Sequence, residues 1–178
     1  MARFTTSKAH CVRARYKILS DKITLRDMTS DDLLKVASIE KQSTAFPWSL
    51  KHFQDCLKAG HQAWVMCDSD QQIVCFTVVQ KVVDELHLLN ICVQRQQQGQ
   101  GFGKTMLNHV IQHAKQLGSV LIVLEVRRSN AKAQSLYNKA GFNEMSVRRD
   151  YYPAKQGRED AILMGLDLDL LSLFGASS

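Results

Sequence analysis

The chain has 178 residues, of which 45% are hydrophobic, and a formal net charge of +6. That length supports one hydrophobic core, and no apolar run approaches the ~18–20 residues of a membrane-spanning helix, so we expect a single soluble domain without a membrane partner. The charge does not indicate a nucleic-acid-binding domain, because residues 1–22 hold six Lys or Arg side chains against one Asp and the remainder is nearly neutral.

The basic segment 1–22 is expected to be a flexible extension, followed by a domain over 23–168 and a tail over 169–178. The extension has no acidic residue before Asp21. It could therefore contact RNA, a ribosome or an anionic surface, be a transit peptide or a mis-assigned start, or simply be solvated. The five cysteines are odd in number and show no C-x-x-C spacing. Such free thiols fit a reducing compartment, so we expect a cytoplasmic protein.

The apolar pattern over the first half of the chain predicts a strand, two helices and three strands. The expected elements are a strand over 23–26, a helix from Ser30 to a break at 45–49, a helix over 50–59, and strands over 63–67, 73–80 and 85–93. Ser30 is the expected N-cap of the first helix. The turn at 68–70 predicts that the strands on either side of it form an antiparallel hairpin.

Helices and strands alternate in the second half. A glycine-rich turn at 99–103 precedes an amphipathic helix that ends at Gly118, and the strand over 120–126 is apolar apart from Glu125, which suits a buried, partly parallel position. A helix from 129–130 through Ala140 and strands over 142–150 and 160–168 follow. The order βααβββαβαββ predicts one α/β (α+β) domain with a mixed central sheet between helices, in three layers.

The glycine-rich turn lies between a strand and a helix, where free backbone N–H groups and the helix dipole favour a phosphate. Three kinds of fold use such a turn. A Walker loop requires a glycine where Gln98 stands, and a dinucleotide-binding turn requires one where Lys104 stands. Both alternatives therefore match poorly, and a helix that merely starts after a flexible turn remains open from the turn alone.

The sequence around the turn points more specifically to one family. Residues 93–107 resemble the V-x-P-x-x-[QR]-x-x-G-x-[GA]-x-x-x-L signature of the GNAT acetyltransferase superfamily, with Arg95 in place of the proline. Within that superfamily, further segments resemble the bacterial ribosomal-protein-alanine N-acetyltransferases. They are 45–49, 90–93, 124–127, 129–131, 136–137, 141–142, 148–153 and 159–161. The resemblance runs from about Ile23 to Leu168.

The resemblance implies a co-substrate and a site. Acetyl-CoA would place its pyrophosphate on the backbone of six residues, which are Gly99, Gln100, Gly101, Phe102, Gly103 and Lys104. Its pantetheine arm would lie along Ile91, Cys92 and Val93, whose N–H groups can polarise the thioester oxygen. Asn130 would hold the arm by its side-chain amide. The resemblance assigns the role of general base to Glu125 and of general acid to Tyr137, with no metal.

Residue chemistry supports these two roles but leaves alternatives. Glu125 is the only charged residue in 120–126, so burial there would raise its pKa toward the range of a general base. Alternatively, its carboxylate pairs with Arg127 or Arg128. Tyr137 could donate a proton to the leaving sulfur or could be a core aromatic residue.

The acceptor is expected to be an α-amine. Such an amine titrates near ~7.7–8.0 and a lysine near ~10.4, so a mild carboxylate base serves the former better. The resemblance implies that the acceptor is the N-terminal alanine of a small-subunit ribosomal protein. The oligomeric state is open, with a monomer favoured, and we expect no direct sequence-specific nucleic-acid partner. Trp48, Tyr151 and Tyr152 are candidates for the entry groove. A GNAT enzyme for lysine or a small amine, and a non-catalytic acyl-CoA-binding or ribosome-associated module, remain open.

Two further groups of residues, a histidine pair and a cysteine, give weaker evidence for a functional site. His109 and His113 have the i, i+4 spacing of metal ligands. However, Val110 stands where a zinc-protease motif has Glu, and both rings could lie on a solvated helix face. Cys92 lies in an apolar segment and is expected to be a packing thiol rather than a nucleophile.

Overall fold

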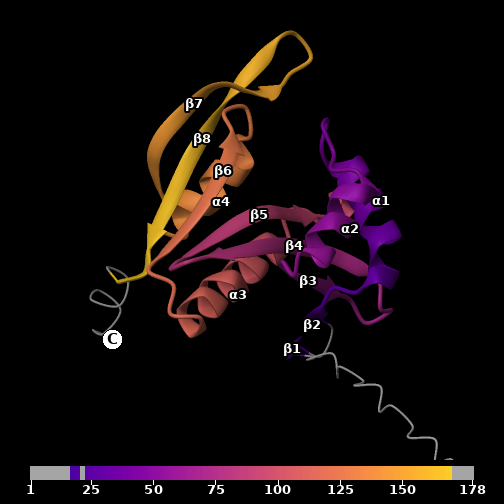
Figure 1. The fold of residues 1–178 in the computed structure, drawn as a ribbon. Coiled ribbons are helices and arrows are strands. Elements are labelled where there is room, and N and C mark those ends of the chain that lie inside the picture. The colour runs from indigo at the N-terminus through magenta and orange to yellow at the C-terminus, as the bar shows by residue number, and fades with distance from the viewer. Residues whose placement is uncertain (1–16, 21–22, 170–178) are drawn as a thin grey trace, which may run out of the picture.

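The computed structural model describes residues 17–20 and 23–169, which form an eight-stranded sheet with helices on both faces (Figure 1). The strand order is β1-β2-β3-β4-β5-β6-β8-β7. Every neighbouring pair is antiparallel except β5 and β6, which are parallel. The expected mixed sheet between helices is confirmed. No helix in the described ranges is both long and apolar enough to cross a membrane.

The elements of the first half lie close to their expected positions. They are β1 (Lys17–Ser20), β2 (Ile23–Asp27), α1 (Leu33–Ser43), α2 (Leu50–Lys58), β3 (Gln62–Cys67), β4 (Ile73–Val82) and β5 (Glu85–Val93). The helix start differs. Ser30 begins a 3-10 turn, and the carboxylate of Asp32 accepts hydrogen bonds from the backbone N–H and the hydroxyl of Thr29 at 2.8 and 3.0 Å. Thr29 and Asp32 therefore fix the entry into α1, not Ser30 alone.

The second half contains α3 (Phe102–Gln116), β6 (Leu121–Arg127), α4 (Ala131–Lys139), β7 (Asn143–Pro153) and β8 (Arg158–Asp167). The last two strands are longer than expected and form a hairpin that rises from the body of the molecule (Figure 1). Its register is interrupted between Arg148 and Tyr152, and Asp150 in the interruption has a positive φ of 48°. Polar residues in this hairpin obscured its true ends, because strand patterns weaken where both faces are exposed.

Strand β1 is absent from the expected order. Residues Lys17–Ser20 pair antiparallel with β2, although the sequence analysis assigned them to the N-terminal extension. The sheet therefore begins before Ile23. The rest of the extension, residues 1–16 and 21–22, and the tail after Asp169 lie outside the described residues.

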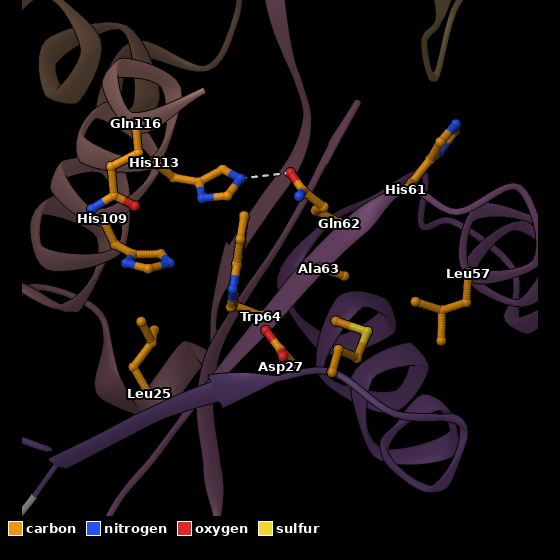
Figure 2. A pocket seen from close by; sticks show the side chains of 11 residues that line it. Leu25, Asp27, Leu57, His61, Gln62, Ala63, Trp64, His109, His113 and Gln116 are labelled. Carbon is orange, nitrogen blue, oxygen red and sulfur yellow. Dashed lines mark hydrogen bonds between the residues drawn. The ribbon is translucent and has the colours of Figure 1, made fainter. Parts of the chain in front are cut away.

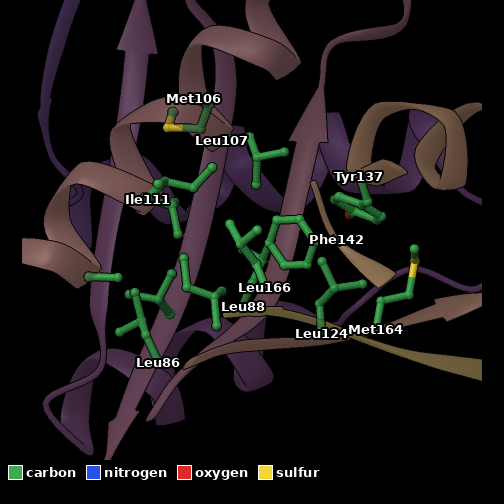
Figure 3. Close-up of a cluster of buried hydrophobic side chains, with 14 of the residues drawn as sticks. Leu86, Leu88, Met106, Leu107, Ile111, Leu124, Tyr137, Phe142, Met164 and Leu166 are labelled. Atoms are coloured by element: carbon green, nitrogen blue, oxygen red, sulfur yellow. The ribbon is translucent and has the colours of Figure 1, made fainter. Parts of the chain in front are cut away.

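Two hydrophobic clusters hold the layers together, one on each face of the sheet. On one face α3 and α4 cover a cluster that includes Leu86, Leu107, Leu124, Tyr137 and Phe142 (Figure 3). On the other face α1 and α2 cover a cluster that includes Val36, Phe53, Phe76 and Cys92. β4 contributes to both clusters, which explains its unbroken run of buried residues.

The parallel pair β5 and β6 is joined over only half its length. Pairing runs from Glu85 opposite Leu121 to Leu88 opposite Leu124, and no further pair is formed among the described residues. Immediately beyond, the register of β5 with β4 shifts, which leaves Leu89 as an extra residue in β5. From there the half of the sheet made of β6, β8 and β7 diverges from the half made of β4 and β5 (Figure 1). Beyond Leu88 and Leu124 the two strands are therefore no longer paired with each other, and we call the place where they diverge the cleft.

Candidate active site

The start of α3 lies at one end of this cleft. Gly101 is the N-cap with a φ of 88°, Gly99 has a φ of 82°, and a Cβ at either position would meet no atom within 4 Å. The first turn of α3 contains no acidic residue, so nothing opposes an anion there. Glycine adopts such conformations more readily than residues with a side chain. This geometry fits the pyrophosphate of a CoA ester.

The other glycine of the turn has a different role. Gly103 is helical, and a Cβ there would lie 3.4 Å from Leu136 Cδ2 and 3.6 Å from Val93 Cγ2. These two neighbours belong to α4 and to the end of β5, on either side of the cleft. Gly103 therefore lies between the end of β5 and α4, and a Cβ there would be in ordinary van der Waals contact with both. Phe102 packs its ring against the hydrophobic cluster, so its backbone, not its side chain, is available to a ligand.

The free edge of β5 borders the cleft. Ile91 and Val93 pack toward α3 and α4, whereas Cys92 is buried toward α1 and α2. Burial raises the pKa of the Cys92 thiol to about 12, so the thiol stays protonated and behaves as the expected packing residue. Because β6 has diverged here, those backbone groups of β5 that do not pair with β4 face the opening, and they can pair with an extended, amide-containing ligand.

Asn130 caps α4, as expected. Its side-chain oxygen accepts a hydrogen bond from the N–H of Ala133 at 3.1 Å. The cap uses the acceptor atom of the amide, so the amide nitrogen is the atom with which Asn130 can contact an arm in the cleft.

Glu125 lies on β6 just beyond the last residue paired with β5. Its neighbours Leu124 and Val126 face α3 and α4, so Glu125 points to the opposite face, toward α1 and α2. Its side chain is 24% exposed, and the Nη1 atom of Arg148 lies 2.7 Å from its Oε1 atom. Glu125 is therefore only partly buried, whereas burial was expected.

The alternative partners are wrong. Arg127 pairs with Glu159 at 2.6 Å and Arg128 pairs with Asp160 at 3.3 Å. Arg148 is remote in sequence and reaches Glu125 only because β8 lies between β6 and β7, a topology that the spacing of residues does not reveal.

Tyr137 lies on the other face of the cleft. It is 6% exposed and its ring contacts that of Phe142 at 5.8 Å between centroids. Burial, and secondarily the neighbouring Tyr152, raise the pKa of Tyr137 above its usual range. The phenol therefore keeps its proton throughout the working pH range and can act only as a donor or as a core residue.

The three residues expected to line the entry groove, Trp48, Tyr151 and Tyr152, lie in two different parts of the structure. Tyr151 and Tyr152 lie at the end of β7 with their rings 5.0 Å apart. Burial, followed by the charge of Glu125, raises the pKa of Tyr152 to about 12, so Tyr152 lies within electrostatic range of the candidate base. Trp48 instead packs on Phe53 at 5.4 Å and supports α2.

Sequence reasoning did not identify Phe46 or Glu40 as residues near the cleft, and it considered Arg127 only as a partner of Glu125. Phe46 and not Trp48 faces β6, because the guanidinium of Arg127 lies 4.6 Å from its ring centroid. The carboxylate of Glu40 is buried, and its Oε1 atom accepts from Asn90 Nδ2 at 3.2 Å and from the N–H of Trp48 at 3.4 Å. Burial raises the pKa of Glu40. A detectable signal existed, since Glu40 follows Val36 by four residues on the apolar face of α1.

A separate hollow of about 430 Å³ lies between β2, β3 and the second half of α3, and contains none of the expected site residues (Figure 2). His109 and His113 line it, with their rings 4.8 and 4.7 Å from that of Trp64. They are partly buried against this indole and do not lie on a solvated face. In the described part of the chain, no group of three or more His, Cys, Asp or Glu side chains is placed to hold a metal.

A parallel strand pair that opens beside an anion-binding helix start, with a carboxylate on one face of the opening and a phenol on the other, is the architecture of an N-acetyltransferase. The chain belongs to the acetyltransferase (GNAT) family, whose model matches residues 25–142. The expected family is thereby confirmed, and its co-substrate is acetyl-CoA.

Relatives match over nearly their whole length. The [ribosomal protein bS18]-alanine N-acetyltransferase of Escherichia coli K12 is 38% identical over 147 residues, which are 83% of this chain and 99% of the relative. The crystal structure of the ribosomal-protein-S18-alanine N-acetyltransferase from E. coli superposes with a TM-score of 0.77 over 82% of this chain and 94% of that one. A spermidine/spermine N-acetyltransferase from Vibrio cholerae has a TM-score of 0.71 over 88% of this chain and 98% of that one, at 20% identity, which shows a shared fold alone.

Proposed function

We propose that this chain transfers the acetyl group of acetyl-CoA to the α-amine of an N-terminal alanine, on a small-subunit ribosomal protein in the bacterial cytoplasm. The observation that carries the proposal is the 38% identity to the bS18-alanine N-acetyltransferase over 99% of that enzyme. The positions of Glu125, Tyr137 and the glycine-rich turn support it. The free state of the four described cysteines fits a reducing compartment.

The residues of the cleft divide the chemistry between the two faces of the sheet. Bound acetyl-CoA supplies the activated acetyl thioester. The backbone at Ile91–Val93 holds the arm and polarises the carbonyl, while Gly99–Lys104 binds the phosphates. Glu125 takes a proton from the attacking α-amine on the face of α1 and α2. Tyr137 gives its proton to the departing thiolate on the face of α4, and the C–S bond is replaced by the new C–N bond.

Arg148 adds a positioning role to this scheme. Its guanidinium holds one oxygen of Glu125, so that the carboxylate is oriented before an amine arrives. Since Arg148 is half exposed, the pair is hydrated and can exchange partners with an entering ammonium group.

The proposal is tested by measuring CoA release with matched acceptors. One peptide begins Ala-Arg, a second has the same sequence with a blocked N-terminus and an internal lysine, and the third acceptor is spermidine. We expect turnover with the first peptide only. Turnover restricted to spermidine or to the blocked lysine peptide would reject α-amine transfer, and acetyl-CoA binding without any turnover would favour the non-catalytic module.

Tyr137→Phe should lower turnover less than loss of the base does. A thiol titrates near ~8.5, so its thiolate leaves with little assistance. The phenylalanine ring keeps the contact with Phe142, so thermal unfolding should shift little. Single-turnover kinetics with the Ala-Arg peptide would measure the effect. Wild-type rates in this variant would assign Tyr137 to the core alone.

Two truncations separate the extension from the domain. Removing residues 1–16 should leave peptide acetylation and thermal unfolding unchanged. Removing residues 1–22 also deletes β1 and exposes the edge of β2, so we expect unchanged acetylation but a lower melting temperature, by about 2–4 °C per kcal/mol lost. Loss of peptide turnover in a folded 1–16 deletion would place the extension in the acceptor site.

A further inference from the structure

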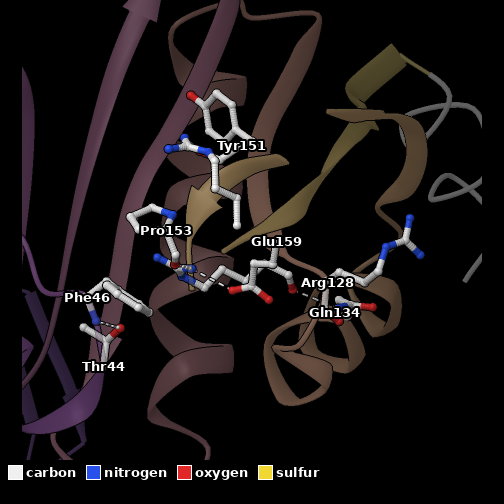
Figure 4. Close-up of polar contacts among 9 residues, drawn as sticks. Thr44, Phe46, Arg128, Gln134, Tyr151, Pro153 and Glu159 are labelled. Carbon is white, nitrogen blue, oxygen red and sulfur yellow. Dashed lines mark hydrogen bonds and ion pairs between the residues drawn. The ribbon is translucent and has the colours of Figure 1, made fainter. Parts of the chain in front are cut away.

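The guanidinium of Arg127 joins the two segments that border the acceptor side of the cleft. Its Cζ atom lies 4.6 Å from the ring centroid of Phe46, in the loop between α1 and α2, and 4.3 Å from that of Tyr152, at the end of β7. Two polar contacts fix it from the hairpin side. Nη1 donates to the carbonyl of Pro153 at 2.8 Å and to Oε1 of Glu159 at 2.6 Å (Figure 4).

Arg127 is placed directly beside the candidate base. Residues 125 and 127 on β6 point to the same face of the sheet, two positions apart. The Arg127 side chain is 19% exposed, so this cation is held by its neighbours and not by solvent. Arg127 therefore connects the loop and the hairpin on the side of the sheet to which Glu125 points, the side from which we expect the acceptor to approach.

The same residue also supports the start of α4 through its backbone. Its carbonyl accepts from the N–H of Asn130 at 2.9 Å and from the side chain of Gln134 at 3.1 Å. Its side chain therefore acts on the acceptor side of the cleft, while its main chain orders the cap that contains Asn130. The two effects separate experimentally, because substitution of the side chain leaves the carbonyl in place.

We propose that Arg127 is a positioning residue whose contacts with Phe46, Tyr152 and Glu159, here called the Arg127 bridge, set the width of the acceptor opening and so restrict the first residue of the acceptor to a small side chain. This inference rests on the proposed α-amine transfer. Arginine suits the role because its planar group stacks on aromatic faces while its edge donates in fixed directions, which a lysine ammonium does not do.

The test compares kcat/KM for two peptides that differ only in their first residue, Ala or Leu. Arg127→Ala should raise KM for the Ala peptide and lower its kcat/KM by about 10- to 100-fold, as expected when an acceptor is no longer held in line. It should also lower the preference for Ala over Leu by about tenfold or more, since a single methylene in a fitted pocket is already worth about that much and Leu is three carbons larger than Ala. Arg127→Lys retains the charge opposite Glu159 and should show the same loss of preference.

Two controls keep the test decisive. Arg128→Ala removes the neighbouring arginine, which pairs with Asp160 at 3.3 Å and is half exposed, and should leave both peptides unaffected. Phe46→Ala removes one side of the Arg127 bridge from a loop and leaves the β6 ladder intact, so it replaces Arg127→Ala if the latter does not fold. A merely structural role would lower activity on both peptides equally and leave their ratio unchanged.

Unchanged preference in folded Arg127→Ala, Arg127→Lys and Phe46→Ala, with an active wild type, would overturn the inference and leave the proposed function intact. A wild type that acetylates neither peptide would remove the proposed function, and this inference with it. The two failures are therefore distinguished by the wild-type measurement alone.

Discussion

Replacing Glu125 by Gln should reduce single-turnover acetylation of an Ala-Arg peptide by about 10²–10⁴-fold, the usual contribution of general acid–base catalysis. The substitution keeps the size of the side chain and its place on β6, and removes only the basic oxygen and the charge that faces Arg148. Acetyl-CoA affinity by calorimetry should be unchanged, because the proposed cofactor contacts come from β5 and the start of α3.

The pH dependence of this variant makes the expectation more specific. An α-amine titrates near ~7.7–8.0, so its neutral fraction rises steeply between pH 7 and 9. Glu125→Gln should therefore recover part of its activity as the pH rises, since fewer amines then need a base. Glu85→Gln is the matched control. The Oε2 atom of Glu85 lies 2.7 Å from the Nε2 atom of His87, at the end of β5 that is paired with β6 and away from the cleft. Wild-type turnover of Glu125→Gln near pH 7 would show that another group accepts the proton.

Gly101→Asp should weaken acetyl-CoA binding by about 100-fold or more, because like charges ~4 Å apart at a protein surface repel by about 4 kcal/mol. Calorimetry with acetyl-CoA gives the affinity directly. Gly101→Asn is the matched control. Asn and Asp have nearly the same shape and both tolerate a left-handed backbone, which Gly101 has at a φ of 88°. The neutral variant should therefore lose much less affinity. Equal losses would attribute the effect to backbone strain and not to a phosphate.

The sequence predicted the elements of this fold well wherever one residue type dominates. Segments rich in Val, Ile, Leu, Cys and Phe marked β4, β5 and β6, and the glycine-rich turn marked the start of α3. β1 was missed because its four residues lie in a segment whose basic composition resembles a solvated tail. The shift at Leu89 leaves no mark in composition either, since it is a property of the pairing between two strands and not of one strand.

The backbone part of the candidate site was more predictable than the side-chain part. Gly101 and Asn130 act through local geometry, which short motifs encode. The surroundings of Glu125 depend on the sheet order, which brings β7 within reach of β6 across β8. For that reason Arg148 was missed as a partner and the burial of Glu125 was overestimated. The contacts of Arg127 likewise join segments separated by long stretches of chain.

The divergence of β5 and β6 also bears on aggregation. An unpaired strand edge can form hydrogen bonds with a strand of another chain. Proteins usually protect such edges at the rim of a sheet with charged residues or with short strands. Here the unpaired edge lies in the interior of the sheet, bordered by the turn before α3 and by α4. Under the proposed function, this edge pairs with the amides of the pantetheine arm and not with a strand of another protein. The protein can thus retain a permanently incomplete hydrogen-bonding ladder without offering it to a second polypeptide.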